Sequence, residues 1–304
     1  MSLLVTGTVG IDTVHTPAGS VERVPGGSCA YFAAAASFHA PVRLVAAVGG
    51  DWPGEHRRLL EGFANLSMEG LEVRPAGTTF AWGGRYLDDM NRRETLFTEL
   101  GVLAEDPPTV PAAYRDSDII FLANTHPTEQ AAMLAQLPAR RLVVADTMDL
   151  WIRTTRPELE ALLARVDGLM LNDSEARQLT DMGNAISAGR KILQLGPSFV
   201  VVKKGEHGCI LVHRDGVAAL PAYPAEAEHV VDPTGAGDSF AGGFMGHIAS
   251  AGQADFRTIQ AALAWGTVTA SFTIEAFSLD RLARLTRREI DERMKAFQAA
   301  VRVG

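Results

Sequence analysis

Residues 231–244 read Val-Asp-Pro-Thr-Gly-Ala-Gly-Asp-Ser-Phe-Ala-Gly-Gly-Phe and predict a glycine-rich loop that leads into an apolar helix. Pro233 cannot continue a strand, and it holds the preceding Asp232 in an extended conformation. Gly235 and Gly237 permit backbone geometry that is closed to other residues and let a ligand approach the main chain. Because a helix follows, the loop presents free backbone N–H groups at a helix N-terminus, which is a ready binding site for an anion.

Asp238 falls in the first turn of the expected helix. A carboxylate there can simply complement the positive end of the helix dipole, which is worth under about 1 kcal/mol. A bound anion would repel such a carboxylate, so the position also indicates an acid/base group beside a transferring phosphate. Gly242 and Gly243, inside the helix, each cost about 1 kcal/mol relative to Ala and indicate close packing of this helix against its neighbours.

Short apolar strands alternate with helical patterns along most of the chain. Strict alternation predicts βαβ units and a doubly wound, mainly parallel sheet with helices on both faces. The expected strands are Leu3–Thr6, Val42–Val48, Ile119–Ala123, Leu142–Ala145, Gly168–Leu171 and Phe199–Val202, with a hairpin of Cys209–His213 and Val217–Pro221. The expected helices are Ser28–Phe38, Gly54–Asn65, Thr128–Gln136, Glu158–Ala164, Ser174–Thr180, Ala185–Leu195, Ala236–Ser250, Phe256–Phe272 and Arg287–Val301.

Two polar segments, about 12–25 and 78–100, interrupt this alternation. The second carries the strand-like fragments Thr79–Trp82, Arg85–Leu87 and Glu94–Phe97. Long insertions in a tight α/β domain are usually functional, so we expect one small β-sheet that covers the crevice as a lid; two unrelated surface loops are the alternative. Since no linker or repeat divides the sequence, a single domain over residues 1–304 is predicted. An exposed lid edge would allow a homodimer, and a monomer is equally consistent.

Composition excludes several classes of function. The chain has 304 residues, of which 28 are basic and 36 acidic, and a formal net charge of −8. Nucleic-acid coating and polybasic membrane anchoring both need a positive field, so neither partner is expected. Cys29 and Cys209 lie outside any C-x-x-C pair, which predicts buried, reduced thiols. The first residues do not resemble a signal peptide and no apolar run approaches 18 residues, so a cytoplasmic protein is expected.

The run from Asp232 to Asp238 resembles the D-x-x-G-A-G-D signature of the PfkB family of carbohydrate and nucleoside kinases. Four more stretches resemble motifs of that family in the family's order: Gly10–Asp12, Gly26–Ala33 (which departs at Tyr31–Phe32, where an Asn is often seen), Leu171–Glu175 and Val202–Gly208. The resemblance implies a ribokinase-like three-layer α/β/α fold. It also implies a kinase that moves the γ-phosphoryl group of ATP to a hydroxyl of a sugar, a sugar acid or a nucleoside.

The resemblance also implies catalytic roles, carried over by position. Asp238 would be the general base that takes a proton from the acceptor hydroxyl. The N–H groups of Gly235, Ala236 and Gly237 would form an anion hole for the γ-phosphoryl group, since phosphoryl transfer depends mainly on positioning and charge stabilisation.

The acceptor and nucleotide sides follow from the same resemblance. Asp12 would hydrogen-bond two acceptor hydroxyls, and Gly26 and Gly27 would form a hinge for lid closure. On the nucleotide side the implied residues are Lys203, Gly205 and Gly208; the two glycines also suit a tight β-turn.

Metal sites are implied at two places. Asn172 and Glu175 would organise Mg²⁺ and its waters; alternatively, Glu175 is an exposed first-turn residue, with Asp173 or Ser174 as a simple cap. In the family members that have one, Asp232 and Thr234 would border a monovalent-cation (K⁺) site. Its other half would lie in Ser271–Ser278, which departs from the glycine often found there.

Several alternatives stay open. The same fold also serves a catalytically silent sensor of sugars or nucleotides, whereas a dinucleotide-dependent dehydrogenase is disfavoured because the G-x-G-x-x-G fingerprint is missing. Asn124 and Asp146 follow expected strands at the crevice, and no role is assigned to them. The lid aromatics Phe80, Trp82 and Tyr86 would either stack on a nucleobase or form the lid core or a dimer contact.

Overall fold

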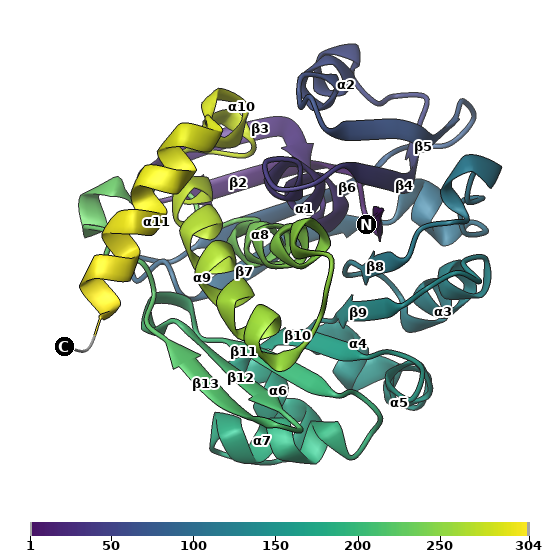
Figure 1. Ribbon diagram of the computed structural model, residues 1–304. Coiled ribbons are helices and arrows are strands. Elements are labelled where there is room, and N and C mark those ends of the chain that lie inside the picture. The colour runs from purple at the N-terminus through teal and green to yellow at the C-terminus, as the bar shows by residue number, and fades with distance from the viewer. Residues whose placement is uncertain (1, 303–304) are drawn as a thin grey trace.

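A large β-sheet forms the centre of the computed structural model, which describes residues 2–302 (Figure 1). In this part of the chain its strand order is β13-β12-β11-β10-β9-β8-β1-β4-β5. All neighbouring pairs are parallel except those of β12, which is antiparallel to both β11 and β13. The strands are β1 (Leu3–Thr6), β4 (Val42–Gly49), β5 (Leu66–Arg74), β8 (Ile119–Leu122), β9 (Leu142–Asp146), β10 (Gly168–Asn172), β11 (Phe199–Lys203), β12 (Cys209–His213) and β13 (Gly216–Leu220).

Helices cover both faces of this sheet, so the predicted three-layer doubly wound fold is confirmed. Successive strand residues point to opposite faces: Leu3 and Val5 of β1 belong to one core and Leu4 to the other. The first face carries α1 (Ser28–Ala36), α2 (Gly54–Glu61), α8 (Ala236–Ala251), α9 (Phe256–Thr273), α10 (Asp280–Arg284) and α11 (Arg287–Val301). The second carries α3 (Pro127–Ala135), α4 (Asp149–Thr154), α5 (Arg156–Leu163), α6 (Asp173–Thr180) and α7 (Ala185–Leu193). Four 3₁₀ turns complete the chain: η1 (Gly101–Ala104), η2 (Ala112–Tyr114), η3 (Gly205–His207) and η4 (Ala227–His229).

Helix α8 packs unusually close to its neighbours, as its glycines predict. A Cβ at Gly242 would stand 2.5 Å from the Phe32 carbonyl oxygen of α1. A Cβ at Gly243 would stand 2.6 Å from the Thr269 hydroxyl of α9. These contacts leave no room for a side chain, and they fix the position of the α8 N-terminus relative to α1.

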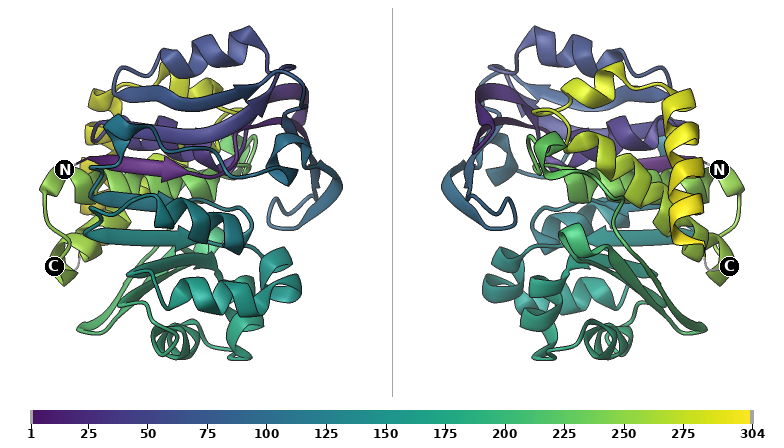
Figure 2. Two further views of the ribbon diagram at one scale, coloured as in Figure 1. Left: turned by 90° about the vertical axis from the view of Figure 1, so that its right-hand side faces the viewer. Right: turned by 90° about the vertical axis from the view of Figure 1, so that its left-hand side faces the viewer.

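The two polar segments form one four-stranded sheet of order β3-β2-β6-β7, which confirms the expected lid. Its strands are β2 (Gly10–Thr16), β3 (Gly19–Gly26), β6 (Phe80–Tyr86) and β7 (Arg93–Glu99). In the left-hand view of Figure 2 this sheet lies on the right, on the side opposite both termini.

The prediction of two separate fragments within residues 79–87 is wrong, because β6 is continuous. Its glycines do not break the strand, since aromatic rings occupy the space next to them. A Cβ at Gly83 would stand 2.2 Å from the Phe97 ring, and one at Gly84 would stand 2.1 Å from the Trp82 ring.

Three elements escaped the sequence analysis. Strand β5 is the edge of the large sheet, and its polar residues Ser67, Glu69 and Glu72 face solvent, which hides the apolar run expected of a buried strand. Helices α4 and α10 are only 6 and 5 residues long, too short to show a helical period.

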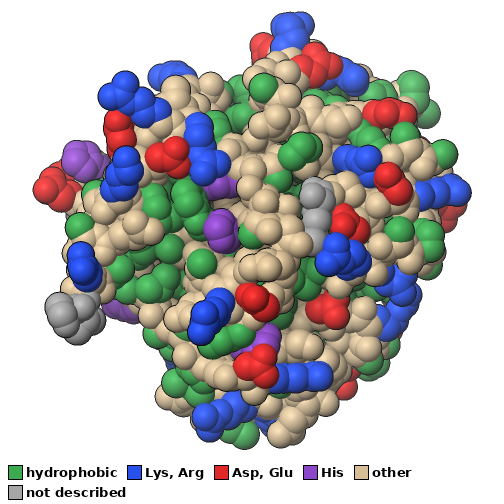
Figure 3. Space-filling view, viewed as in Figure 1, with side chains coloured by type: hydrophobic (Ala, Val, Ile, Leu, Met, Phe, Trp, Pro, Cys, Tyr) green, Lys and Arg blue, Asp and Glu red, His purple; other side chains and the backbone are tan. Residues whose placement is uncertain are grey.

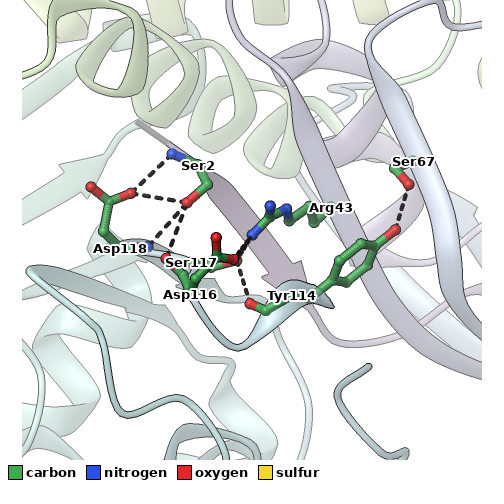
Figure 4. Close-up of polar contacts among 7 residues, drawn as sticks. All are labelled: Ser2, Arg43, Ser67, Tyr114, Asp116, Ser117 and Asp118. Atoms are coloured by element: carbon green, nitrogen blue, oxygen red, sulfur yellow. Dashed lines mark hydrogen bonds and ion pairs between the residues drawn. The ribbon is translucent and has the colours of Figure 1, made fainter. Parts of the chain in front are cut away.

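Polar contacts tie together the amino-terminal edge of the large sheet (Figure 4). Asp118, just before β8, accepts hydrogen bonds from the Ser2 N–H at 2.9 Å and from the Ser2 hydroxyl at 3.1 Å. Arg43 of β4 pairs with Asp116 and donates to the Ser117 hydroxyl at 2.9 Å. These contacts join the neighbouring strands β8, β1 and β4 at the edge remote from the lid.

Basic and acidic side chains are interspersed on the molecular face shown in Figure 3. Cys29 and Cys209 are free and buried, as expected. Over residues 2–302, every helix falls short of the length and hydropathy required for a membrane span.

We expect Gln130→Leu to lower the free energy of unfolding by about 3 kcal/mol, because buried carbonyl groups would lose their donor. The Gln130 side-chain amide donates to the carbonyls of Leu122, Ala123 and Asp146 at 3.0, 3.1 and 2.9 Å, and so joins β8 to β9. Urea denaturation at pH 7 measures the effect. The control is Gln178→Leu, which removes one solvent-exposed bond to the Asp149 carbonyl and should cost no more than about 0.5 kcal/mol. Equal losses in the two variants would contradict this role of Gln130.

Candidate active site

A broad cleft runs along the carboxyl ends of the parallel strands, between the large sheet and the lid. Open α/β sheets bind ligands at this edge, because the loops that follow the strands diverge there. All the predicted site residues line the cleft except Gly26 and Asp232, which lie just behind its wall. The structure therefore brings together residues from positions 12 to 238 of the chain.

The loop before α8 starts the helix with a backbone conformation that favours glycine. Gly235 has φ 73° and ψ 0°, and a Cβ there would stand 2.3 Å from the ring of Tyr31. The Ala236 N–H donates to the Pro233 carbonyl at 3.1 Å, so this member of the predicted anion hole is already engaged in a turn. Within residues 2–302, the N–H groups of Gly235 and Gly237 have no such partner, and they are the amides left for an anion.

Asp238 lies in the first turn of α8, half-buried and facing the cleft. Burial raises the pKa of Asp238 from 3.8 to about 7, and the negative charge of Asp146 adds to the rise. The positive charges of Lys203 and Arg93 oppose it. A carboxyl group with a pKa near neutrality is suited to take and release a proton at physiological pH.

Lys203, at the end of β11, is the central cation of the site. Its Nζ lies 3.1 Å from Asp146 Oδ2, and a Cβ at Gly237 would stand 3.2 Å from that Nζ. Burial lowers the pKa of Lys203, but Asp146, Glu175 and Asp238 outweigh this and leave it raised. The predicted nucleotide-side lysine thus sits beside the expected phosphate loop. Its partner Asp146 was visible in the sequence only as a strand-end residue without a role.

Asn172 and Glu175 form a reciprocal cap at the start of α6. Asn172 Oδ1 accepts from the Glu175 N–H at 2.8 Å, and Glu175 Oε2 accepts from the Asn172 N–H at 2.7 Å. The alternative, an exposed Glu175 in a helix capped by Asp173 or Ser174, is wrong. Glu175 is buried, and Asn172 caps the helix. Burial, and then Asp146, raises the pKa of Glu175 to about 7.

The donor set at this corner fits Mg²⁺ held mostly through water. Glu175 uses one carboxylate oxygen for the cap, which leaves Oε1 for a metal-bound water, and Asp146 lies close by. Mg²⁺ prefers oxygen ligands and keeps several waters, so few protein ligands are needed. Residues 2–302 contain no cluster of three or more His, Cys, Asp or Glu side chains placed to bind a metal directly.

The Asp232 carboxylate is engaged within the protein. Its Oδ1 accepts from the Thr234 N–H at 2.8 Å, and its Oδ2 accepts from the Ser278 N–H at 3.4 Å. The residue is fully buried, and it ties the loop before α8 to the segment after α9. Each oxygen keeps a second lone pair, and the monovalent-cation site at Asp232 and Thr234 stays a prediction.

The predicted acceptor residues lie against one another. Asp12 of β2 is 3% exposed and accepts a hydrogen bond from the Gly27 N–H. A Cβ at Gly26 would stand 2.0 Å from Asp12 Oδ2, and a Cβ at Gly27, where φ is 92°, would stand 2.4 Å from the Thr8 carbonyl oxygen. Only glycines therefore allow the carboxylate to sit at the entrance of α1. Burial raises the pKa of Asp12 to about 7.

The nucleotide-side turn follows Lys203. Gly205 has φ 55°, and a Cβ there would stand 3.4 Å from Asn91 Oδ1 of the lid, whereas a Cβ at Gly208 would stand 2.0 Å from the Leu220 carbonyl. Gly208 therefore serves the close approach of β13, and the left-handed backbone at Gly205 favours glycine in the turn. The lid reaches this turn, because Asn91 Nδ2 donates to Glu206 Oε1 at 3.0 Å.

The lid aromatics are largely occupied by contacts within the lid. Phe80 lies against Gly10, and Trp82 lies against Gly84 and under the guanidinium of Arg93, 5.1 Å from the ring centre. The Tyr86 hydroxyl accepts a 3.4 Å hydrogen bond from Thr234. The contacts of Phe80 and Trp82 belong to the lid core, whereas that of Tyr86 joins the lid to the loop before α8. All three side chains also line the cleft, and stacking on a base stays a prediction.

Arg93 of β7 is a site residue that the sequence analysis missed. It is exposed, lines the cleft from the lid, and lowers the pKa values of both Asp12 and Asp238 across it. A single arginine in a polar segment carries no motif, so only the folded lid reveals it.

Comparison with known proteins agrees with this geometry. A family model described as pfkB family carbohydrate kinase matches residues 108–282. A cytidine kinase from Thermococcus kodakarensis is 32% identical over 252 residues, which cover 81% of this chain and 87% of that protein.

Solved structures share the fold over nearly the whole chain. A Burkholderia thailandensis nucleoside kinase in complex with inosine has a TM-score of 0.75 at 22% identity, covering 98% of this chain and 99% of that one. An E. coli protein provisionally assigned as a ribokinase II, solved in complex with ATP and Mg²⁺, has a TM-score of 0.77 at 17% identity. The match covers 97% of this chain and 99% of that one. The fold is therefore ribokinase-like, as predicted.

We expect substitutions at the Lys203–Asp146 pair to move the pKa of Asp238 in opposite directions. Asp146→Asn removes a repelling negative charge and should lower it, whereas Lys203→Gln removes an attracting positive charge and should raise it. Carboxyl ¹³C NMR titration measures the values, with the Asp238 signal assigned by its loss in Asp238→Asn. The control, Lys204→Gln, deletes the same charge one residue further on and should shift the value less. Shifts of the same sign in both test variants would refute this electrostatic arrangement.

Proposed function

The chain belongs to the pfkB family of carbohydrate kinases, and from this membership we propose that it transfers the γ-phosphoryl group of ATP to a hydroxyl of a ribonucleoside. As a member, it is a carbohydrate or nucleoside kinase, an enzyme that phosphorylates a sugar or a nucleoside. The ATP donor, the nucleoside acceptor and the residue roles below are the proposal. The observation that carries it is Asp238, placed between the free amides of its own loop and a cleft that reaches Asp12.

Asp238 acts as the general base. The acceptor hydroxyl gives its proton to the Asp238 carboxylate while its oxygen forms a new bond to the γ-phosphorus. The bond from that phosphorus to the β–γ bridging oxygen breaks in line, and ADP leaves. The cost of burying Asp238 makes its carboxylate a stronger base than an exposed one, which favours the proton transfer.

The loop amides and two cations stabilise the transferring group. The N–H groups of Gly235 and Gly237 point at the phosphoryl oxygens from the α8 N-terminus, where the helix dipole adds to them. Lys203 lies next to Gly237, and Arg93 faces the same region from the lid. When bound near Asn172 and Glu175, Mg²⁺ neutralises phosphate charge.

A nucleoside acceptor is supported by the relatives. The Thermococcus kodakarensis relative is a cytidine kinase, and the Burkholderia thailandensis structure contains inosine. In this proposal the Asp12 carboxylate accepts hydrogen bonds from two ring hydroxyls, as carboxylates do with sugars. A silent sensor of the same fold is less consistent with the site, because the base and the phosphate loop are both present.

An acceptor screen tests the proposal directly. Purified protein with ATP and Mg²⁺ should release ADP in the presence of cytidine or another ribonucleoside, and far more slowly with free ribose, because ribose lacks the base. ADP release is followed by a coupled assay. Binding of nucleosides without turnover would favour the sensor, and turnover with sugars alone would reject the nucleoside acceptor.

Asp238→Asn should lower kcat by about 10²–10⁴-fold, because it removes the general base.

The same variant should have a higher free energy of unfolding than wild type at pH 8. The native pKa of Asp238 lies above its unfolded value, so its ionisation destabilises the fold progressively as pH rises from about 4 through 7, and the amide escapes this penalty. Steady-state kinetics and urea denaturation at pH 5 and pH 8 measure both effects. The control, Asp291→Asn on the exposed face of α11, should change neither; near-normal turnover of Asp238→Asn would remove Asp238 from the mechanism.

A further inference from the structure

Tyr31 of α1 has a buried hydroxyl for which residues 2–302 offer no hydrogen-bond partner. The side chain is 1% exposed and lines the cleft, with its ring packed against Gly235. A buried polar group without a partner is costly, and such groups in native structures call for an explanation.

Two other buried tyrosines show that this chain normally satisfies their hydroxyls. Tyr86 accepts from Thr234 at 3.4 Å. Tyr114 pairs with Ser67 (Figure 4), and its hydroxyl accepts from the Glu69 N–H at 3.1 Å. Tyr31 differs from both because its buried hydroxyl has no partner among residues 2–302.

The surroundings of Tyr31 keep its hydroxyl a hydrogen-bond donor. Burial, followed by the charges of Asp232 and Asp12, holds the pKa of Tyr31 well above its usual value. Each oxygen of Asp232 already accepts a backbone N–H. Asp12, in contrast, has a buried Oδ1 without a partner among residues 2–302. Both Tyr31 and Asp12 line the cleft, and the charge of Asp12 contributes to the raised pKa of Tyr31, so the same wall carries an unpaired donor and an unpaired acceptor.

A ligand hydroxyl complements this pair, since it can donate one hydrogen bond and accept another. We infer that Tyr31 and Asp12 together bind one ring hydroxyl of the acceptor, and that Tyr31 thereby makes the enzyme select ribonucleosides over the deoxy analogues that lack this hydroxyl. The ring hydroxyl donates to Asp12 Oδ1 and accepts from the Tyr31 hydroxyl. This inference rests on the nucleoside acceptor proposed above.

Selection of this kind is strong because binding the wrong substrate leaves polar groups of the protein without hydrogen bonds. A deoxy analogue would leave two buried polar groups unpaired in the closed complex. Sites built to hydrogen-bond a substrate hydroxyl reject the analogue without it by about 10⁴–10⁵-fold. Tyr31 is then a specificity-determining residue, distinct from the base at Asp238.

The test combines Tyr31→Phe with removal of the substrate hydroxyl. The kcat/KM values of wild type and variant are measured with ATP and cytidine, 2′-deoxycytidine and 3′-deoxycytidine. For cytidine the variant should lose about 10–100-fold, while for one of the two deoxy analogues it should change by less than about threefold. Tyr86→Phe is the matched control: its hydroxyl is bonded within the protein, so any loss should be equal for all three nucleosides.

Stability of the free protein distinguishes substrate binding from a structural role. The phenylalanine keeps the ring against Gly235, and only an unpaired hydroxyl is lost, so the Tm of Tyr31→Phe without ligand should equal or exceed that of wild type. A fall in Tm of more than about 3 °C would show that the hydroxyl is satisfied in the free protein and would overturn the inference. Equal losses of Tyr31→Phe on all three nucleosides would also overturn it, while cytidine turnover by wild type would still stand. No turnover of any nucleoside by wild type would reject the proposed function and the inference with it.

Discussion

Close contact between helices α1 and α8 sets the geometry on which the site depends. Glycine at position 242 lets the two backbones approach until the Phe32 carbonyl leaves no space for a side chain. Both helices begin at the cleft, α1 after Gly27 and α8 after Gly235. Their packing therefore fixes the distance between the acceptor residues at one N-terminus and the phosphate loop at the other. Tyr31 bridges the two, since it belongs to α1 and supports the loop of α8.

The cleft concentrates carboxyl groups that burial makes difficult to ionise. The pKa values of Asp12, Glu175 and Asp238 are each raised to about 7, and the buried Lys203 already pairs with Asp146. Such a site is unfavourable for the fold at neutral pH, because native groups must be charged in a poorly solvated place. Cations and hydroxyl donors that bind with the substrates lower the free-energy cost of ionising these carboxyl groups. Active sites commonly give up stability for activity in this way.

The lid connects the two ends of the site through a single small sheet. Strand β2 carries Asp12, its neighbour β6 leads into the turn before β7, and β7 carries Arg93. In that turn, Asn91 donates to Glu206 beside the nucleotide-side turn. Movement of the lid would therefore change the acceptor pocket and the position of a cation over Asp238 together. A lid of this kind can exclude water from the transferring phosphoryl group and limit hydrolysis of the donor.

Local pattern in the sequence was sufficient for most strands and helices, though not for β5, α4 and α10, and for the lid segments and the loop at 235–238, because each depends on residues close together along the chain. Backbone requirements could also be anticipated, since proline and glycine restrict or extend φ and ψ wherever they occur. The pairing of Lys203 with Asp146 could not, because it joins the ends of β11 and β9, which sit on either side of β10 only once the sheet is assembled. The same holds for the engaged N–H of Ala236, the reach of Arg93 across the cleft and the unpaired hydroxyl of Tyr31. Charge, burial and hydrogen-bond partners are properties of a three-dimensional neighbourhood, and the chain acquires that neighbourhood only by folding.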